Sequence, residues 1–195
     1  MIFSRCLLNG VQVESIPMTT LEDGNRILLY QMASQDQQME GSNLIFTEFR
    51  QDFSSIQIHN PKEVHEKFYH YFQNGNSLYL LVNTNNNVIG TIALDYDKME
   101  PYISNLVICS NNRGKGYSKL LLQFIENSEN AFGYIKLWCN PELKPFYEKM
   151  GYREEDSSIV NGRSCKILKK VLKRSTMIDS LQISSWNSDD NYEYF

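Results

Sequence analysis

The clearest pattern of hydrophobic and polar residues in this sequence begins at residue 102. Residues 102–109 form an uninterrupted β-prone run, which predicts a strand buried on both faces. After a glycine-containing turn, apolar residues recur from Tyr117 to Ile125 with the spacing of one helical face, and the other face carries polar residues such as Glu126. Alternation over residues 134–139 predicts a second strand. The predicted order is strand, turn, helix, strand and a short helix.

The segments on either side of this region predict further elements. Residues 77–83 and 88–96 alternate apolar residues on either side of an Asn-rich turn, which predicts a β-hairpin. Pro61 suits the first position of an amphipathic helix that Gly75 would end. Residues 152–173 predict the last two strands, joined by a tight Asn-Gly turn.

The N-terminal part gives weaker signals. Residues 11–18 predict a first strand, and residues 19–23 resemble a capping box. Apolar residues within 27–32 then predict a helix, which would fade into the polar residues 34–38. Residues 43–58 contain β-prone pieces broken by polar residues and give no assignment.

Length, composition and charge narrow the class of protein. A chain of 195 residues fits one domain, which we expect to cover residues 1–174, followed by a polar and acidic tail at residues 175–195. The net charge of −4 argues against a nucleic-acid partner. No apolar run approaches the length of a membrane span, so we expect a cytoplasmic protein with no membrane partner.

The four cysteines do not suggest a metal site. Cys6, Cys109, Cys139 and Cys165 lie far apart, without a Cys-x-x-Cys pair or a histidine cluster. We therefore expect buried free thiols and no bound metal.

The turn after the first strand has the features of a phosphate-binding site. Arg113, Gly114, Lys115 and Gly116 stand between the strand and the helix. The first N–H groups of a helix have no partner inside it, and together with the helix dipole they attract anions. Glycines let a ligand approach the backbone, and the basic side chains add positive charge. The sequence matches neither the P-loop nor the dinucleotide fingerprint.

This region resembles the acetyl-CoA signature of the GNAT superfamily of N-acetyltransferases, with residues 113–118 as the signature and serine at its last position. A second hallmark follows, an asparagine at residue 140 and the pattern Phe-Tyr-x-x-x-Gly at residues 146–151. The resemblance covers residues 77–171. It implies a single α/β (α+β) domain with a mixed, mostly antiparallel sheet, flanking helices and splayed central strands. It also implies an enzyme, an N-acetyltransferase with acetyl-CoA as cosubstrate.

The resemblance assigns roles to particular residues. The backbone N–H of Leu106 or Val107 would donate to the acetyl oxygen, and Ile108 would pair with the pantetheine arm. Tyr147 would protonate the departing thiolate, although a tyrosine that merely packs under the sheet would look the same. Asn140 would bridge CoA and the backbone, or serve as a helix N-cap. The residues implied in binding acetyl-CoA are Leu106, Val107, Ile108, Arg113, Gly114, Lys115, Gly116, Tyr117, Ser118, Asn140, Phe146 and Tyr147.

No general base emerges from the sequence. Many superfamily members carry an acid on the strand before the turn, where this chain has Ser104 and Asn105, the candidate substrate-binding residues. The other acids close in sequence are interpreted as solvated loop charges: Asp95, Asp97, Glu100 and Glu142.

Within the superfamily, the strand and turn most resemble glucosamine-6-phosphate N-acetyltransferases, so D-glucosamine 6-phosphate is the first candidate acceptor. Its phosphate would need cationic partners, for which the sequence offers Lys98, Arg153 and Arg163. In that family the hairpin helps to form a cleft shared by two subunits, which leaves a homodimer open. Another small amine, a protein N-terminus or a lysine are the alternative acceptors. A non-catalytic acetyl-CoA-binding module and an interaction protein acting through the tail are the competing classes.

Overall fold

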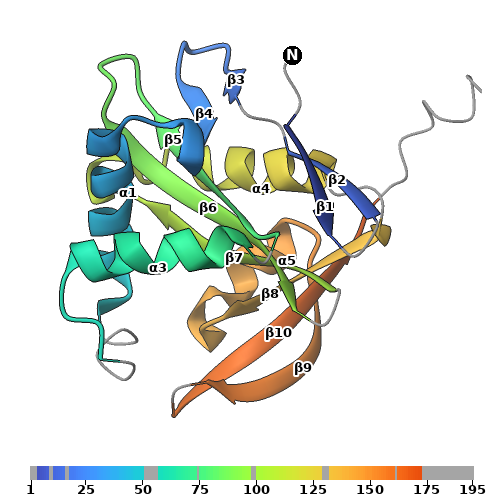
Figure 1. Cartoon of the computed structure of the whole chain (residues 1–195). Helices are drawn as coiled ribbons and strands as arrows, with labels where there is room; N and C mark the ends of the chain where they lie inside the picture. Colours follow the sequence, from blue (N-terminus) through green and yellow to red (C-terminus); the bar gives the residue numbers. More distant parts are fainter. Residues whose placement is uncertain are drawn as a thin grey trace, which may run out of the picture.

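The computed structural model describes residues 4–8, 11–15, 18–50, 57–73, 75–97, 100–128, 132–160 and 162–172. Most of them belong to one sheet with helices on both faces (Figure 1). The predicted tail and Lys98 lie outside the described residues.

Eight of the described strands form a single sheet in the order β3-β4-β5-β6-β7-β8-β10-β9. All neighbours are antiparallel except β7 and β8, which run parallel, so the predicted mixed, mostly antiparallel sheet is confirmed. The strands are β3 (Met18–Thr20), β4 (Arg26–Leu29), β5 (Ser77–Val82), β6 (Val88–Asp97), β7 (Glu100–Ile108), β8 (Tyr134–Cys139), β9 (Arg153–Val160) and β10 (Arg163–Val171). A separate hairpin consists of β1 (Ser4–Leu8) and β2 (Val11–Ser15).

The helices pack on opposite faces of this sheet (Figure 1). They are α1 (Gln35–Glu48), α3 (Pro61–Gln73), α4 (Tyr117–Ser128) and α5 (Lys144–Lys149), with 3-10 turns η1 (Tyr30–Met32), η2 (Ser110–Asn112) and η4 (Pro141–Leu143). Ile45 of α1 and Phe68 of α3 share one core with Leu80 of the sheet. Leu121 of α4 and Tyr147 of α5 belong to a second core on the other face. We call these surfaces the α1/α3 face and the α4/α5 face.

The predicted helix over residues 27–32 is wrong, because this segment contains strand β4 and the turn η1. Ile27 and Leu29 are buried in the core of the α4/α5 face. Leu28 and Tyr30 are buried in the core of the α1/α3 face. Consecutive apolar residues here therefore reflect a strand that is covered on both sides, not one face of a helix.

The first long helix, α1, begins later, at a capping box formed by Ser34 and Gln37. Ser34 Oγ accepts from the Gln37 N–H at 3.3 Å, and the Gln37 side chain accepts from the Ser34 N–H at 3.1 Å. The helix buries a narrow stripe that includes Gly41 and Ile45. A Cβ at Gly41 would come within 2.6 Å of a Leu80 methyl group, so close packing on the sheet requires glycine. Small and polar residues in the stripe explain why hydrophobic periodicity did not predict this helix.

Other predicted elements are confirmed, with two corrections to burial. The β5–β6 hairpin, α3, α4 and the β9–β10 pair form where the sequence predicts them. Strand β7 is not buried on both faces throughout, because Tyr102 and residues 104–106 are only partly buried. Glu126, expected on the polar face of α4, is buried and accepts hydrogen bonds from Tyr152 Oη at 2.9 Å and Lys170 Nζ at 2.6 Å.

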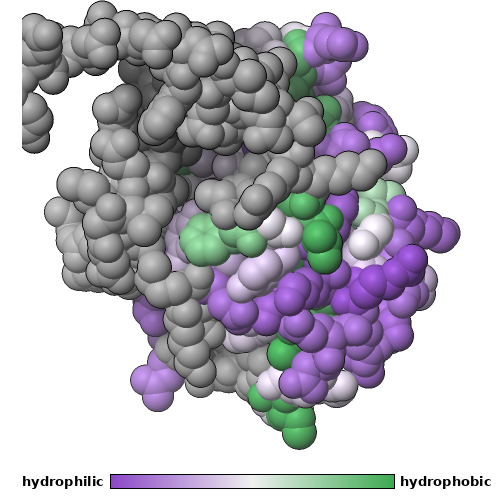
Figure 2. Space-filling model, turned by 90° about the vertical axis from the view of Figure 1, so that its right-hand side faces the viewer, coloured by the Kyte–Doolittle hydropathy of each residue, from purple (hydrophilic) through white to green (hydrophobic). Residues whose placement is uncertain are grey.

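The surface of the described part is largely polar on the side shown in Figure 2, where hydrophobic residues form small separate groups. Charged side chains pair across the outer strands, as Lys136 and Lys169 do with Glu155 at 2.9 and 3.2 Å. Within the described residues, no helix has the length and hydrophobicity needed to cross a membrane.

Candidate active site

The central feature of the site is the point where strands β7 and β8 part. Their parallel pairing comprises only Tyr102 with Lys136 and Ile103 with Leu137. Strand β7 continues to Ile108 and β8 to Cys139, yet no further pair joins them in the described sheet. The two central strands are therefore splayed, and backbone groups of β7 beyond Ile103 are available to a ligand.

A β-bulge lies on β7 at this opening. The register with β6 changes between Ser104, opposite Ala93, and Val107, opposite Thr91. Asn105, in the bulge, has a φ of 48°, and its carbonyl oxygen accepts from Thr91 Oγ1 at 2.7 Å. Leu106 is the other bulge residue, so the N–H groups assigned to the acetyl oxygen come from a segment that leaves the regular ladder. That assignment to Leu106 or Val107 stays a prediction.

The turn after β7 leaves its backbone open. Gly114 and Gly116 have φ values of 76° and 84°, and a Cβ built on either would meet nothing within 4 Å. Helix α4 starts at the next residue, and the Leu120 N–H bonds the Gly116 carbonyl at 3.1 Å. The free N–H groups of the first helical turn thus lie beside an uncovered glycine loop, as a phosphate ligand requires. The signature has glycine or alanine at the position of Ser118. Ser118 is the second residue of helix α4, a position where the backbone does not require glycine.

Basic and aromatic residues of the turn have structural partners. Arg113 Nε donates to the Ile108 carbonyl at 3.0 Å, and Arg113 Nη2 pairs with Glu48 of α1 at 2.9 Å. Tyr117 Oη donates to Asp23 at 3.3 Å. The Arg113 side chain therefore links the turn to β7 and α1. Lys115 is exposed.

Tyr147 is buried on the α4/α5 face beneath β8. Its ring contacts those of Phe146 and Tyr152, with centroids 5.0 and 5.9 Å away. Burial, and to a lesser extent the neighbouring Cys139 thiol, raises the pKa of Tyr147 above its ordinary value of 10.0. The phenol is consequently protonated at neutral pH, which is the state a proton donor needs.

Asn140 caps the turn η4 at the end of β8. Its side-chain oxygen accepts from the Glu142 N–H at 3.2 Å. The N-cap interpretation is confirmed, and the bridge to CoA stays a prediction.

Asp95 is not the solvated loop charge that the sequence suggested. It lies near the end of β6, and its Oδ1 is buried without a hydrogen-bond partner in the described structure. Burial raises the pKa of Asp95 to about 6, and a hydrogen bond with Ser104 opposes this rise. The alternation of side chains along β6 could have indicated this position in the sequence. Asp95 follows Ala93 by two residues, so the two side chains lie on the same face of the strand, and Ala93 is buried.

Glu100 behaves differently. It accepts from Lys136 at 3.0 Å and from Tyr134 at 3.0 Å, and these bonds lower its pKa. Ser104 and Asn105, the predicted acceptor-binding pair, contact each other through an Asn105 Nδ2 to Ser104 Oγ bond of 3.1 Å.

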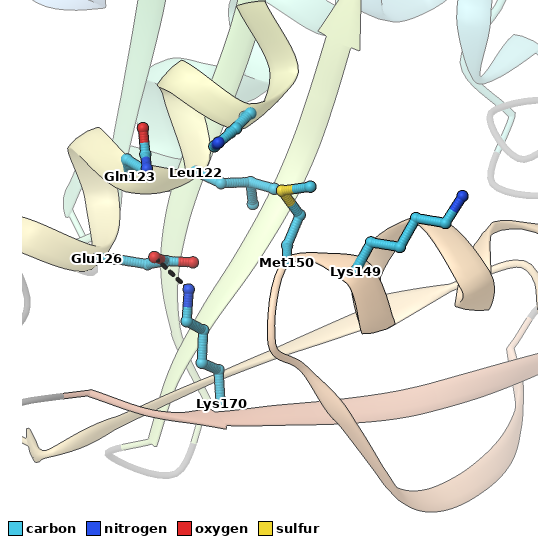
Figure 3. A pocket seen from close by; sticks show the side chains of 7 residues that line it. Leu122, Gln123, Glu126, Lys149, Met150 and Lys170 are labelled. Atoms are coloured by element: carbon cyan, nitrogen blue, oxygen red, sulfur yellow. Dashed lines mark hydrogen bonds and ion pairs between the residues drawn. The ribbon is translucent and has the colours of Figure 1, made fainter. Parts of the chain in front are cut away.

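A cavity of about 140 Å³ lies between α4, α5 and β10 (Figure 3). Lys170 points to Glu126 there, while Lys149 points away from it (Figure 3). The volume is below the ~300 Å³ typical of small-ligand pockets, so this cavity alone would not hold a nucleotide. Its lining consists of Lys119, Leu122, Gln123, Glu126, Lys149, Met150 and Lys170.

The described cysteines Cys109, Cys139 and Cys165 are free, as expected, but only Cys139 is buried and the other two are partly exposed. Among the described residues, no group of three or more His, Cys, Asp or Glu side chains could hold a metal ion.

Solved structures share this fold. A GNAT-family acetyltransferase from Staphylococcus aureus Mu50 has a TM-score of 0.58 and 19% identity, covering 76% of this chain and 99% of its own. An aminoglycoside 6'-N-acetyltransferase complexed with coenzyme A has a TM-score of 0.61 and 14% identity, covering 74% of this chain and 96% of its own. No curated protein sequence matches the chain.

The sequence profile of the acetyltransferase (GNAT) domain matches residues 49–167. This range includes the parting strands, the glycine turn and Tyr147. The chain therefore belongs to the GNAT family of acetyltransferases.

Proposed function

We propose that this acetyl-CoA-dependent N-acetyltransferase transfers the acetyl group directly to a small primary amine. The main support for this proposal is the opening between β7 and β8, because it lies between the predicted cofactor site and the predicted acceptor site. The uncovered glycine turn lies at the end of β7, and Tyr147 lies on the α4/α5 face. An acyl group held by backbone N–H groups in the opening would be accessible to an amine from the α1/α3 face.

The chain's own groups would support direct transfer. N–H donors at the β7 bulge would stabilise negative charge on the carbonyl oxygen as the amine attacks. Burial raises the proton affinity of a departing thiolate as well as that of the Tyr147 phenol. A proton held on Tyr147 could therefore move to sulfur within the cleft.

The described arginines that could bind the phosphate of glucosamine 6-phosphate are far apart. Arg153 is the first residue of β9 and pairs with Lys169, whereas Arg163 is the first residue of β10 and pairs with Val160. These two arginines lie at opposite ends of one hairpin and do not converge. D-Glucosamine 6-phosphate remains a candidate through the resemblance of β7 and the turn, but we expect the amine, not the phosphate, to be recognised.

A thiol-release assay across acceptors tests this proposal. With acetyl-CoA and equal concentrations of glucosamine, glucosamine 6-phosphate, an aminoglycoside and a lysine peptide, we expect release with at least one small amine. The two glucosamines should differ by less than about tenfold, or ~1.4 kcal/mol, because no arginine pair converges to bind the phosphate.

Three other outcomes would contradict the proposal in different ways. Acetyl-CoA binding without release would indicate a non-catalytic module. A preference for the peptide would indicate a protein acceptor. Strong selection of the phosphorylated sugar would restore the phosphate site.

A further inference from the structure

We propose that Asp95 is the catalytic residue that receives a proton from the acceptor, and that the acceptor is a cationic primary amine. This inference rests on the proposed function and names the chemistry of its acceptor side. The supporting observations are the face on which Asp95 lies, its unsatisfied oxygen and the groups around it.

Asp95 and Tyr147 lie on opposite faces of the sheet. Leu94, directly before Asp95, belongs to the core of the α4/α5 face, which also contains Tyr147. Ala93, one residue earlier, belongs to the core of the α1/α3 face. Since side chains alternate along a strand, Asp95 points to the α1/α3 face. The proposed proton acceptor and the proposed proton donor therefore lie on opposite faces of the sheet.

Asp95 is also close to the opening itself. On β7 it pairs with Tyr102, and its hydrogen-bond partner Ser104 is the first residue beyond the last β7–β8 pair. The Asp95 carboxylate, hydrogen-bonded to Ser104, thus lies next to the point where β7 and β8 separate. Many superfamily members carry an acid on this strand, where this chain has Ser104 and Asn105. Here the neighbouring strand β6 supplies a carboxylate beside Ser104.

The unsatisfied oxygen needs an explanation. A buried polar atom without a hydrogen bond destabilises a fold, and a buried charge does so more strongly. No ion pair of the described residues includes Asp95. Lys136, on β8 two strands away, is bound to Glu100 and Glu155 at 3.0 and 2.9 Å. The Tyr71 hydroxyl of α3, a helix that packs on the same face, is likewise buried without a partner. An arriving ammonium group would supply the missing donors.

The surroundings favour a cation over an anion. The ring of Tyr102 meets that of Trp138 edge to face, with centroids 5.6 Å apart, and residue Trp138 is 47% exposed. Aromatic rings beside a carboxylate attract an ammonium group through their π faces. The titratable residues on β7 beside Asp95 are Tyr102, its cross-strand pair, and, at the start of the strand, Glu100 with its bound Lys136. Helix α3 contributes Tyr71 and His65 to the same face of the sheet.

The proton and electron balance of the reaction is complete. The Asp95 carboxylate takes one proton from the ammonium, and this proton passes to solvent. The free nitrogen lone pair forms the C–N bond, the C–S bond breaks with its electrons on sulfur, and the thiolate takes the Tyr147 proton. The nitrogen loses its second proton to solvent, from which Tyr147 is reprotonated. The net products are the amide, the free thiol and one proton.

The test compares Asp95→Asn with Asp156→Asn, which removes an exposed carboxylate from β9. With the full chain and the best amine of the acceptor panel, Asp95→Asn should lower kcat by about 100-fold or more, and Asp156→Asn should leave it unchanged. The affinity for acetyl-CoA, measured by calorimetry, should be the same in both variants. A wild-type enzyme that releases no thiol would refute the proposed function. An active wild type with an equally active Asp95→Asn would refute only this inference.

The pH dependence of kcat/KM distinguishes a catalytic carboxylate from a structural one, because a structural carboxylate would not shift it. Because Asp95 must be ionised and its pKa is about 6, kcat/KM should fall below pH about 6 in the wild type. The Ser104 hydrogen bond lowers this pKa, so Ser104→Ala should shift the acidic limb to higher pH. This second variant tests the inference even if Asp95→Asn does not fold. A limb that Ser104→Ala leaves in place would overturn it.

The stability of Asp95→Asn should move opposite to its activity. The folded pKa is raised from 3.8 to about 6, so ionisation opposes folding increasingly between these pH values and fully above them. Removing the charge should leave Tm at pH 8 unchanged or higher. A clear fall in Tm together with full activity would mark Asp95 as structural.

Discussion

Tyr147→Phe is expected to lose ~100- to 10,000-fold in kcat, the range typical of general acid catalysis, with little change in KM for acetyl-CoA. The substitution keeps the ring between Phe146 and Tyr152 and deletes only the hydroxyl. The thiolate would then have to wait for a proton from solvent. Single-turnover thiol release with the best amine, under conditions where chemistry limits the rate, is the appropriate measurement.

Tyr152→Phe is the matched control, because Tyr152 is a second buried tyrosine in the same core. Its hydroxyl donates to buried Glu126 at 2.9 Å, so its loss should lower the stability by about 1–3 kcal/mol. We expect this variant to lose Tm and keep kcat, and Tyr147→Phe to do the reverse. If both variants kept kcat, Tyr147 would be a packing residue.

Gly116→Ala should weaken acetyl-CoA binding by about 10- to 100-fold, the equivalent of losing one hydrogen bond to a charged group, ~1.5–3 kcal/mol. A Cβ at this position enters open space in the free protein, where the pyrophosphate would have to approach the backbone. The measurement is the acetyl-CoA dissociation constant by calorimetry.

Gly162→Ala separates this effect from backbone strain. Gly162, in the β9–β10 turn, has a φ of 77° and also has open space around its Cβ. Both variants place alanine in the left-handed region at a cost of about 1–2 kcal/mol, so their Tm values should fall similarly. Only Gly116→Ala should lose affinity, and equal affinities in the two variants would contradict a phosphate site at this turn.

Much of the geometry of the candidate site could be predicted from sequence because its parts are contiguous. The strand, the glycine turn and helix α4 form one local unit, and the glycines at 114 and 116 adopt the positive φ that only glycine adopts easily. Tyr147 follows in the next helix, at the position that the family pattern gives it. Each of these features depends on residues close to one another along the chain.

The misassigned N-terminal elements depend on distant residues. Strand β4 has apolar residues on both faces because α1 and α3 cover one side and α4 the other. The sequence of residues 27–32 contains no sign of those layers, so four consecutive apolar residues suit a helix equally well. Helix α1 was missed for the opposite reason, since Gly41 packs on the sheet through its lack of a side chain.

By itself the sequence determined the family, the order of the elements from β5 onward and the place of the glycine turn. Those features are set by local backbone geometry and by the alternation of apolar residues. Only the tertiary structure decided that Arg113 pairs with Glu48, 65 residues away, and that one carboxylate oxygen of Asp95 is buried near the splayed strands. Burial is a property of the layers packed around a residue, and a carboxylate looks the same in sequence whether water or a second strand surrounds it. The sequence alone therefore could not single out Asp95 as the proposed proton acceptor, because that proposal depends on how the strands pair.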